Sequence, residues 1–114
     1  LWKGSYGTTT YLTPETLDLF NTCNFCDIDV RRGVGFDKPQ LGDVGPTCGC
    51  VSMDSFGHSG FTGTFTWADP KEDIIYVFLS NRTYPDATNR KIIKNNLRSD
   101  IQDLIYQAIK DKKE

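Results

Sequence analysis

Alternation of apolar and polar residues is clearest between positions 61 and 67. Aromatic residues take one parity of this run and threonines take the other: Phe61, Phe65 and Trp67 against Thr62, Thr64 and Thr66. A period of two is typical of a strand with one face on a core and the other in more polar surroundings. The glycines of this region, Gly57, Gly60 and Gly63, allow another backbone or a ligand to come close. We therefore predict a strand that runs from Phe56 to about Trp67 and presents groups along its edge.

Two further strands are expected on either side of this one in the sequence. The segment Ile74–Leu79 is apolar on both parities, which predicts a central strand covered on both faces. The short connection 68–73 makes it antiparallel to the strand before it. A short strand is also expected at Gly33–Asp37, ending before Pro39 because proline cannot donate to a ladder. The predicted fold class is α+β, with a partial antiparallel sheet of about three strands.

Two helices are expected beside this sheet. Thr13 is a good N-cap and Pro14 suits the first position of a short helix that fades by about Asn24. A second helix is predicted from about Asn95 to Lys110, packed on one face of the sheet. Its apolar stripe should face the core and its polar residues should face solvent: Leu97, Ile101, Leu104, Ile105, Ala108 and Ile109 against Arg98, Asp100, Gln102 and Asp103.

The chain is expected to be organised as one unit in six segments: 1–26 a loop and short helix, 33–37 a short strand, 38–55 a loop, 56–80 a β-hairpin, 81–94 a loop and 95–111 the C-terminal helix. The short first helix is a poor cover for the second face of the sheet. We therefore expect the sheet to continue into polypeptide outside these residues. An exposed apolar sheet surface or an unpaired edge would then favour self-association.

Composition narrows the possible partners. The chain has 114 residues and a net charge of -2, so it is one small domain or part of one. It has no basic excess, which argues against a nucleic-acid partner. No apolar run is long enough for a membrane span, and no signal peptide is visible. Because the sequence begins with Leu1 and not with methionine, we expect it to be processed, truncated or cut from a longer chain.

The four cysteines, Cys23, Cys26, Cys48 and Cys50, form a C-x-x-C pair and a C-x-C pair. Zinc takes four thiolates from two such pairs, although the second pair is tighter than the common spacing. Disulfides are the alternative in an oxidising compartment. The favoured interpretation is plain thiols, with no metal and no cofactor.

The order of motifs resembles that of a known family. His58-Ser59-Gly60 is followed by Phe61-Thr62-Gly63-Thr64-Phe65, a hairpin, an apolar strand that ends in Leu79-Ser80-Asn81-Arg82-Thr83-Tyr84-Pro85, and a helix. This series resembles the C-terminal part of the serine β-lactamase and penicillin-binding-protein family, of the class C type, and 11–16 and 33–39 match it as well. The variant with Gly-Phe-Asp-Lys-Pro and Gly-His-Ser-Gly-Phe-Thr-Gly-Thr looks most like β-lactamase-type domains that follow family 3 glycoside hydrolase (β-N-acetylglucosaminidase) domains in bacterial envelope proteins.

The resemblance implies the C-terminal portion of a β-lactamase/transpeptidase-like fold and a place in the bacterial periplasm or cell envelope. It also implies acyl transfer through an acyl-serine, for which the family uses Ser-x-x-Lys, Tyr-x-Asn and a His/Lys-Thr/Ser-Gly triplet. Only the triplet is present among the 114 residues. We therefore expect the chain to be inactive alone and to need the upstream part of the same polypeptide, which together would act on a small acyl substrate or a cell-wall peptide.

Site roles follow from the same resemblance. The candidate catalytic residues are His58, Ser59, Gly60 and Phe61, the last through its backbone N–H in an oxyanion hole. The candidate substrate contacts are Thr62, Gly63 and Asn81. Asp86 stands where class C enzymes carry an asparagine near the substrate carboxylate, which favours an ester or amide substrate. Two alternatives stay open: a non-catalytic β-lactamase-like module beside a glycoside hydrolase, and a small cysteine-ligated zinc module.

Overall fold

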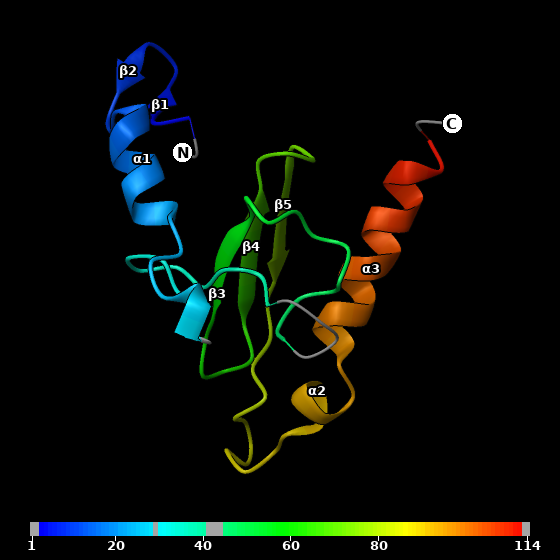
Figure 1. Cartoon of the computed structure of the whole chain (residues 1–114). Helices are drawn as coiled ribbons and strands as arrows, with labels where there is room; N and C mark the ends of the chain where they lie inside the picture. The colour runs from blue at the N-terminus through cyan, green and yellow to red at the C-terminus, as the bar shows by residue number, and fades with distance from the viewer. Residues whose placement is uncertain (1–2, 29, 41–44, 113–114) are drawn as a thin grey trace.

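A computed structural model describes residues 3–28, 30–40 and 45–112. Residues 1–2 of the predicted first loop and 41–44 of the predicted loop 38–55 lie outside the described residues. The main sheet has three antiparallel strands in the order β3-β4-β5, with β3 at Phe56–Ser59, β4 at Phe65–Asp69 and β5 at Ile74–Phe78. The helix α3, Leu97–Lys110, lies along one face of this sheet (Figure 1). The α+β class and the packing of the C-terminal helix are confirmed.

The first part of the chain forms a separate small layer beside the sheet (Figure 1). Strands β1 at Ser5–Tyr6 and β2 at Thr9–Thr10 pair as a hairpin within the predicted loop. Helix α1 follows at Pro14–Asn21, and Thr13 caps it by accepting a hydrogen bond from the Thr16 backbone N–H at 3.3 Å. A 3-10 turn, η1, covers Cys26–Ile28. The capping residue predicted for this helix is confirmed, because a hydroxyl at this position satisfies an otherwise unpaired amide.

The predicted strand Phe56–Trp67 is in fact two strands, β3 and β4. They are joined by a tight turn in which the Gly60 N–H donates to the Thr64 carbonyl at 2.8 Å and the Gly63 N–H donates to the Gly60 carbonyl at 3.0 Å. Gly63 adopts a φ of 90°, which a residue with a side chain rarely adopts. The alternation of aromatics and threonines therefore spans a turn. Phe61 sits in that turn and is 74% exposed, so the expectation that it faces the core is wrong.

The predicted central strand lies at the edge of the described sheet. β4 pairs with both neighbours, whereas β5 pairs only with β4 among the described residues. Ile75 and Val77 on β5 are 61% and 56% exposed, so one face of the strand is not covered. The expected strand Gly33–Asp37 is reduced to isolated bridges from Asp37 to Arg32 and to Gly57. Its residues are mostly in bends, and only Asp37 extends the ladder beyond β3.

The core is small and aromatic. Phe65 and Trp67 of β4 stack with ring centroids 5.5 Å apart, and Tyr76 of β5 meets the Phe65 ring edge-on at 5.8 Å. Trp67 also donates its indole N–H to the buried Ser55 hydroxyl at 2.9 Å. Partly buried hydrophobic residues complete the cluster: Val51, Phe78 and Ile105. The burial of Phe65 and Trp67 confirms the parity assigned to them from the sequence.

Helix α3 presents a different face to the sheet from the one its apolar stripe predicts. Gln102 and Tyr106 are its buried residues. Leu97, Ile101 and Leu104 of the predicted stripe are 41%, 39% and 63% exposed. A short helix, α2 at Lys91–Lys94, precedes α3 within the segment predicted as a loop. Ile105 of the stripe packs against the core, but the residues of α3 that are fully buried are Gln102 and Tyr106, whose side-chain oxygens are hydrogen-bonded.

The buried carboxylate of Asp69, at the end of β4, makes the main one of these contacts. Its Oδ2 accepts hydrogen bonds from the Tyr106 hydroxyl and the Ser52 backbone N–H, both at 2.8 Å. Its Oδ1 accepts from the Ser52 hydroxyl at 2.6 Å and from the Lys71 backbone N–H at 3.2 Å. Burial alone would raise the pKa of Asp69, but these hydrogen bonds favour the charged form and leave the pKa below its ordinary value. One carboxylate thus joins the sheet, the loop before it and α3.

We predict that Asp69→Asn lowers the free energy of unfolding by about 1–3 kcal/mol, because an amide cannot accept all of these buried donors. Urea denaturation at neutral pH measures this loss. Since the folded pKa is depressed, the contribution is present above the unfolded value of about 3.9 and is lost as pH falls through the lower folded value. The wild type should therefore lose stability in this acid range more steeply than the variant. Asp27→Asn, at an exposed position in η1, is the control, and an equal loss there would contradict the prediction.

Candidate functional site

His58 lies on the open face of the sheet, away from α3. Residues that pair directly across strands share one face of a sheet. His58 pairs with Thr66, which pairs with Val77, and all three are exposed. Their neighbours Phe65 and Trp67 point to the other side and are buried. The strand register therefore displays the His58 ring on the surface that the core does not use.

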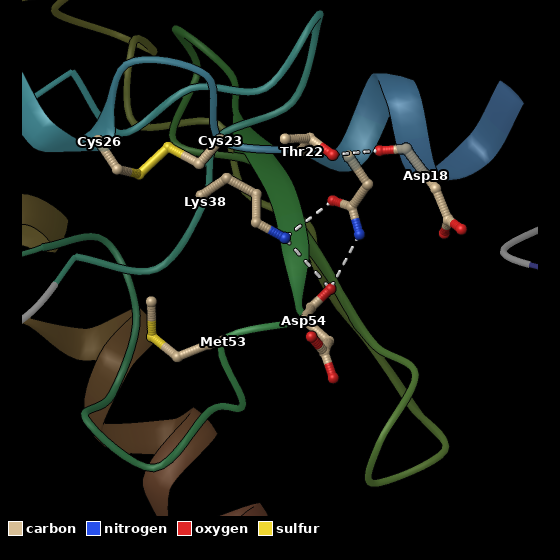
Figure 2. Close-up of a pocket in the computed structure, with 8 residues that line it drawn as sticks. Asp18, Thr22, Cys23, Cys26, Lys38, Met53 and Asp54 are labelled. Atoms are coloured by element: carbon tan, nitrogen blue, oxygen red, sulfur yellow. Dashed lines mark hydrogen bonds between the residues drawn. A yellow bond between two sulfur atoms is a disulfide. The ribbon is translucent and has the colours of Figure 1, made fainter. Parts of the chain in front are cut away.

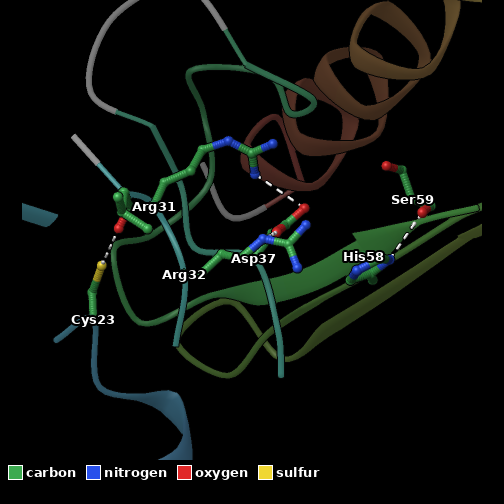
Figure 3. Close-up of polar contacts among 7 residues, drawn as sticks. Cys23, Arg31, Arg32, Asp37, His58 and Ser59 are labelled. Atoms are coloured by element: carbon green, nitrogen blue, oxygen red, sulfur yellow. Dashed lines mark hydrogen bonds and ion pairs between the residues drawn. The ribbon is translucent and has the colours of Figure 1, made fainter. Parts of the chain in front are cut away.

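A shallow cavity of about 420 Å³ lies against this face. Eight residues line it: His58, Ser59, Gly60, Thr64, Phe65, Thr66, Val77 and Leu79. Three of the predicted catalytic residues, His58, Ser59 and Gly60, therefore meet at one hollow. Successive side chains of a strand alternate between its faces, so His58 and Ser59 extend to opposite sides of β3. His58 Nδ1 lies 2.9 Å from the Ser59 carbonyl oxygen (Figure 3).

Gly57 fixes β3 to the core directly before His58. It pairs with Trp67 on one side and with Asp37 on the other. A Cβ atom at this position would lie 2.3 Å from a carbon of the Trp67 ring and 2.2 Å from the Thr66 carbonyl oxygen. Only glycine fits there without moving the backbone, so the Trp67 ring packs directly on the strand that carries His58.

The turn between β3 and β4 packs on the segment after β5. The Thr62 carbonyl accepts hydrogen bonds from the Arg82 backbone N–H at 2.8 Å and from the Ser80 hydroxyl at 3.3 Å. The Arg82 guanidinium lies 4.8 Å from the centre of the Phe61 ring. A Cβ atom at Gly63 would lie 2.8 Å from the Ser80 hydroxyl oxygen. Thr62 and Gly63 thus have structural contacts here, and their predicted contact with substrate stays a prediction.

Asn81 and Asp86 belong to a loop that is held by its own side chains. The Asn81 side-chain oxygen accepts from the Thr83 hydroxyl at 2.7 Å. Arg82 donates from Nη1 to the carbonyls of residues 87 and 89, both at 2.9 Å. The Asp86 carboxylate accepts from the backbone N–H and hydroxyl of Thr88, which lower its pKa below the ordinary value. Asn81 does not line the cavity at His58, so its predicted role in substrate binding stays a prediction.

The four cysteines form two disulfides, Cys23–Cys26 and Cys48–Cys50. Their Cα atoms are 5.6 and 5.2 Å apart, within the usual range for disulfides. The favoured interpretation as plain thiols is wrong for this structure. So is the four-thiolate zinc site, because a sulfur in a disulfide is not a thiolate. The disulfide alternative is the one that the structure supports.

An ion-pair cluster centred on a buried aspartate, which no sequence pattern predicted, lies on the outer side of β3 (Figure 3). Asp37 is 2% exposed and forms ion pairs with Arg31 Nη1 and Arg32 Nε, each at 3.1 Å. Its backbone exchanges hydrogen bonds with Gly57 at 2.8 and 3.0 Å. The Gly-Phe-Asp-Lys-Pro segment therefore holds the outer edge of the strand that carries His58. No periodic signal in the sequence marks these residues, because their partners come from a bend.

Lys38, the next residue, is also buried, at 5% exposure (Figure 2). Its ammonium donates to the Asn21 side-chain oxygen at 2.9 Å and to the Asp54 carbonyl at 3.3 Å. Burial lowers the pKa of Lys38, and the carboxylates of Asp54 and Asp69 oppose this effect. The lysine borders an open cavity of about 310 Å³ between α1 and the loop before β3. It joins α1 to the loop before β3, and the cavity that it borders shares no lining residue with the cavity at His58.

Comparison with known proteins gives the family. The family model described as Beta-lactamase matches residues 2–98. The chain belongs to the beta-lactamase family. Its three-stranded sheet and C-terminal helix are consistent with part of the α+β fold of that family.

Several curated relatives carry the name "Putative D-alanyl-D-alanine carboxypeptidase". Those of Escherichia coli O157:H7 and Escherichia coli strain K12 are 29% identical to this chain over 119 aligned residues, covering 96% of it and 27% of the relative. That of Salmonella paratyphi B is 30% identical over 93 residues, covering 81% of the chain and 21% of the relative. The chain thus spans about a quarter of the length of these relatives. No solved structure matches it. Within the described residues, no helix has the length and apolar character to cross a membrane.

We predict that Asp37→Asn loosens the outer edge of β3, because an amide cannot pair with two guanidinium groups. The free energy of unfolding should fall by about 1–3 kcal/mol. The Gly57 amide, which donates to the Asp37 carbonyl, should exchange its hydrogen faster in NMR or mass-spectrometric experiments. Asp27→Asn, at an exposed position in η1, should change neither quantity. Unchanged exchange at Gly57 in the Asp37 variant would refute the role of this ion-pair cluster.

Proposed function

We propose that this chain is the C-terminal part of a serine acyl hydrolase of the β-lactamase/penicillin-binding-protein class. In this proposal it supplies one wall of the active site, and a serine elsewhere in the polypeptide forms the acyl-enzyme. The supporting observation is the display of His58 over a cavity on the uncovered sheet face. The 114 residues contain neither Ser-x-x-Lys nor Tyr-x-Asn, so the wall needs a partner surface that carries the nucleophile.

His58 is proposed to handle a proton or to bind the substrate through its second ring nitrogen. When Nδ1 carries the proton and donates to the Ser59 carbonyl, Nε2 has its lone pair free. A neutral imidazole in this tautomer is able to accept a proton from a hydroxyl or a substrate group. The short contact to its own strand limits rotation of the ring, which keeps Nε2 in one position.

The Phe61 backbone N–H is proposed as an oxyanion-hole donor. Within the described part of the chain this amide donates to no other group. It lies in a turn that is held on both sides, by the Gly60–Thr64 hydrogen bond and by the Arg82 N–H bonded to the Thr62 carbonyl. A fixed, unpaired backbone donor is what stabilises developing negative charge with little reorganisation.

The proposed substrate is a small ester or amide, or a cell-wall peptide, and the proposed location is the bacterial cell envelope. Relatives named as D-alanyl-D-alanine carboxypeptidases support the cell-wall class. The charged carboxylate of Asp86 would repel a substrate carboxylate nearby, which favours an ester or amide over a free carboxylate at that end. The association with a family 3 glycoside hydrolase domain remains a prediction from the sequence.

The second candidate function is a non-catalytic module. It would apply if the rest of the polypeptide also lacked Ser-x-x-Lys and Tyr-x-Asn, which these 114 residues do not contain. In that case the full polypeptide would have no reactive serine of this type, and the β-lactamase-like domain would serve to position or stabilise its neighbour.

An experiment on the full-length polypeptide distinguishes the two candidate functions. We expect turnover of nitrocefin or a nitrophenyl ester, and a covalent fluorophosphonate adduct on a serine outside these 114 residues. His58→Ala should lower kcat/KM by about 100-fold or more, in the range for loss of an acid–base group. Lys71→Ala, in the exposed β4–β5 turn, is the control and should leave kcat/KM unchanged. Failure to label any serine would support the non-catalytic module.

A companion prediction concerns the 114-residue chain by itself. It should show no turnover and no fluorophosphonate adduct, because it lacks Ser-x-x-Lys. Intact-mass spectrometry after incubation with the probe provides the measurement. A covalent adduct on Ser59 or on another serine of this chain would overturn the assignment of the nucleophile to a separate segment.

A further inference from the structure

The Cys48–Cys50 disulfide lies against α3, next to a carboxylate. The two sulfur atoms and an Asp103 carboxylate oxygen all lie within 4.8 Å of one another. Cys48 is buried, and Cys50 and Asp103 are partly buried. As a disulfide the two sulfurs do not bind zinc, but after reduction two thiolates and a carboxylate on two elements would form a recognised donor set for this metal.

The loop that carries the cysteines is held on α3 by two independent hydrogen bonds. The Cys48 backbone N–H donates to the buried Gln102 side-chain oxygen at 3.1 Å. The Ser99 hydroxyl donates to the Pro46 carbonyl at 3.4 Å. Both contacts are to the backbone of the loop and do not involve sulfur. The loop is therefore expected to stay beside Asp103 when the disulfide is opened.

Asp103 and Gln102 also have neighbours that suit a metal site. The Gln107 side-chain amide donates to Asp103 Oδ2 at 2.6 Å and fixes the orientation of the carboxylate. Such second contacts commonly orient metal ligands. The buried Gln102 Nε2 has no hydrogen-bond partner among the described residues, although its own oxygen binds the Cys48 amide. This amide belongs to the side chain that holds the Cys48 backbone, so a buried donor is left over in the residue that contacts the cysteine loop.

We propose that the reduced Cys48 and Cys50 thiolates and the Asp103 carboxylate bind one zinc ion, with the fourth position open. Zinc binding requires that the Cys48–Cys50 disulfide is first reduced. A dithiol reductant transfers two electrons and two protons to the disulfide and becomes a cyclic disulfide itself. Zinc then displaces the two thiol protons, which go to solvent. The disulfide form and the zinc form exclude each other.

The distances allow this change with small movements. In a tetrahedral site with Zn–S near 2.3 Å, the two sulfurs lie about 3.7 Å apart, so reduction must let them separate from bonding distance. Gly49 between them has nothing within 4 Å of the position that its Cβ would take, so the peptide is free to adjust. A cavity of about 580 Å³, lined in part by Cys48, Asp100 and Asp103, leaves room for a water molecule on the open position. A carboxylate beside the thiolates favours zinc over copper(I).

The site would join the loop before β3 to α3 by a metal, in place of a covalent link confined to the loop. The Cys48–Cys50 disulfide closes a ring within one loop, since its cysteines are two residues apart. Closing so short a loop removes little entropy from the unfolded chain. Zinc bound also by Asp103 would bridge two elements 53 residues apart in sequence, so it should stabilise the folded chain more than the disulfide does.

The test uses the whole 114-residue chain, reduced with a phosphine under argon, and a zinc titration against a chromophoric chelator. We expect one zinc ion per chain, and a thiolate charge-transfer band when cobalt(II) replaces zinc. Asp103→Asn should weaken zinc binding at least tenfold, and Gln107→Ala about 10–100-fold. Asp100→Asn, on the same helix and cavity, is the matched control and should not change the affinity. Asp103→His should restore binding.

Cysteine variants complete the design. Cys48→Ser with Cys50→Ser should abolish zinc binding, whereas Cys23→Ser with Cys26→Ser should leave it intact. The oxidised wild type should not bind zinc. The proposal fails if Asp103→Asn and Asp100→Asn bind alike, if the Cys23/Cys26 variant loses the metal, or if the oxidised chain binds as tightly as the reduced one. Hydrogen exchange of α3 amides in each metal-free variant shows whether the fold is retained.

Discussion

The arrangement of this chain depends on one buried carboxylate. Asp69 accepts hydrogen bonds from Tyr106 on α3, from Ser52 in the preceding loop and from the turn that follows β4. A charge taken out of water is tolerated only when it is satisfied in this way. Because its partners come from three different segments, the carboxylate fixes how the helix sits on the sheet. The aromatic residues of β4 pack beneath the same helix, against its residue Ile105.

The sequence patterns were informative where a residue's surroundings are local. The helix cap at Thr13, the parity of Phe65 and Trp67, and the presence of a C-terminal helix are all properties of short segments, and each was predicted correctly. The rotation of α3 was not, because Tyr106 and Gln102 are buried by polar partners that lie far away in the sequence. Hydrophobic periodicity contains no information about such partners.

The same distinction applies to the candidate site. The order of motifs identified His58, Ser59 and Gly60 as candidate site residues, and all three line one cavity. The motif order gave no indication of the Asp37 ion pairs, which depend on a bend in the chain. It also gave no indication of the buried Lys38, which depends on a contact with α1. The apolar side chains of Ile75, Val77 and Leu79, on β5 and directly after it, are exposed. Leu97 and Leu104 on α3 are exposed as well. Covering such surfaces would add substantially to the small core described here.

The contact between the Trp67 ring and the backbone at Gly57 has a consequence for how the site can change in evolution. The largest residue of the core rests on the strand one position before the histidine, with no side chain between them. Any residue other than glycine at position 57 would lift the strand and carry the imidazole with it. Divergence in substrate preference should therefore accumulate in the turns that frame the cavity. The backbone at position 57 serves as a fixed reference from which those turns can vary.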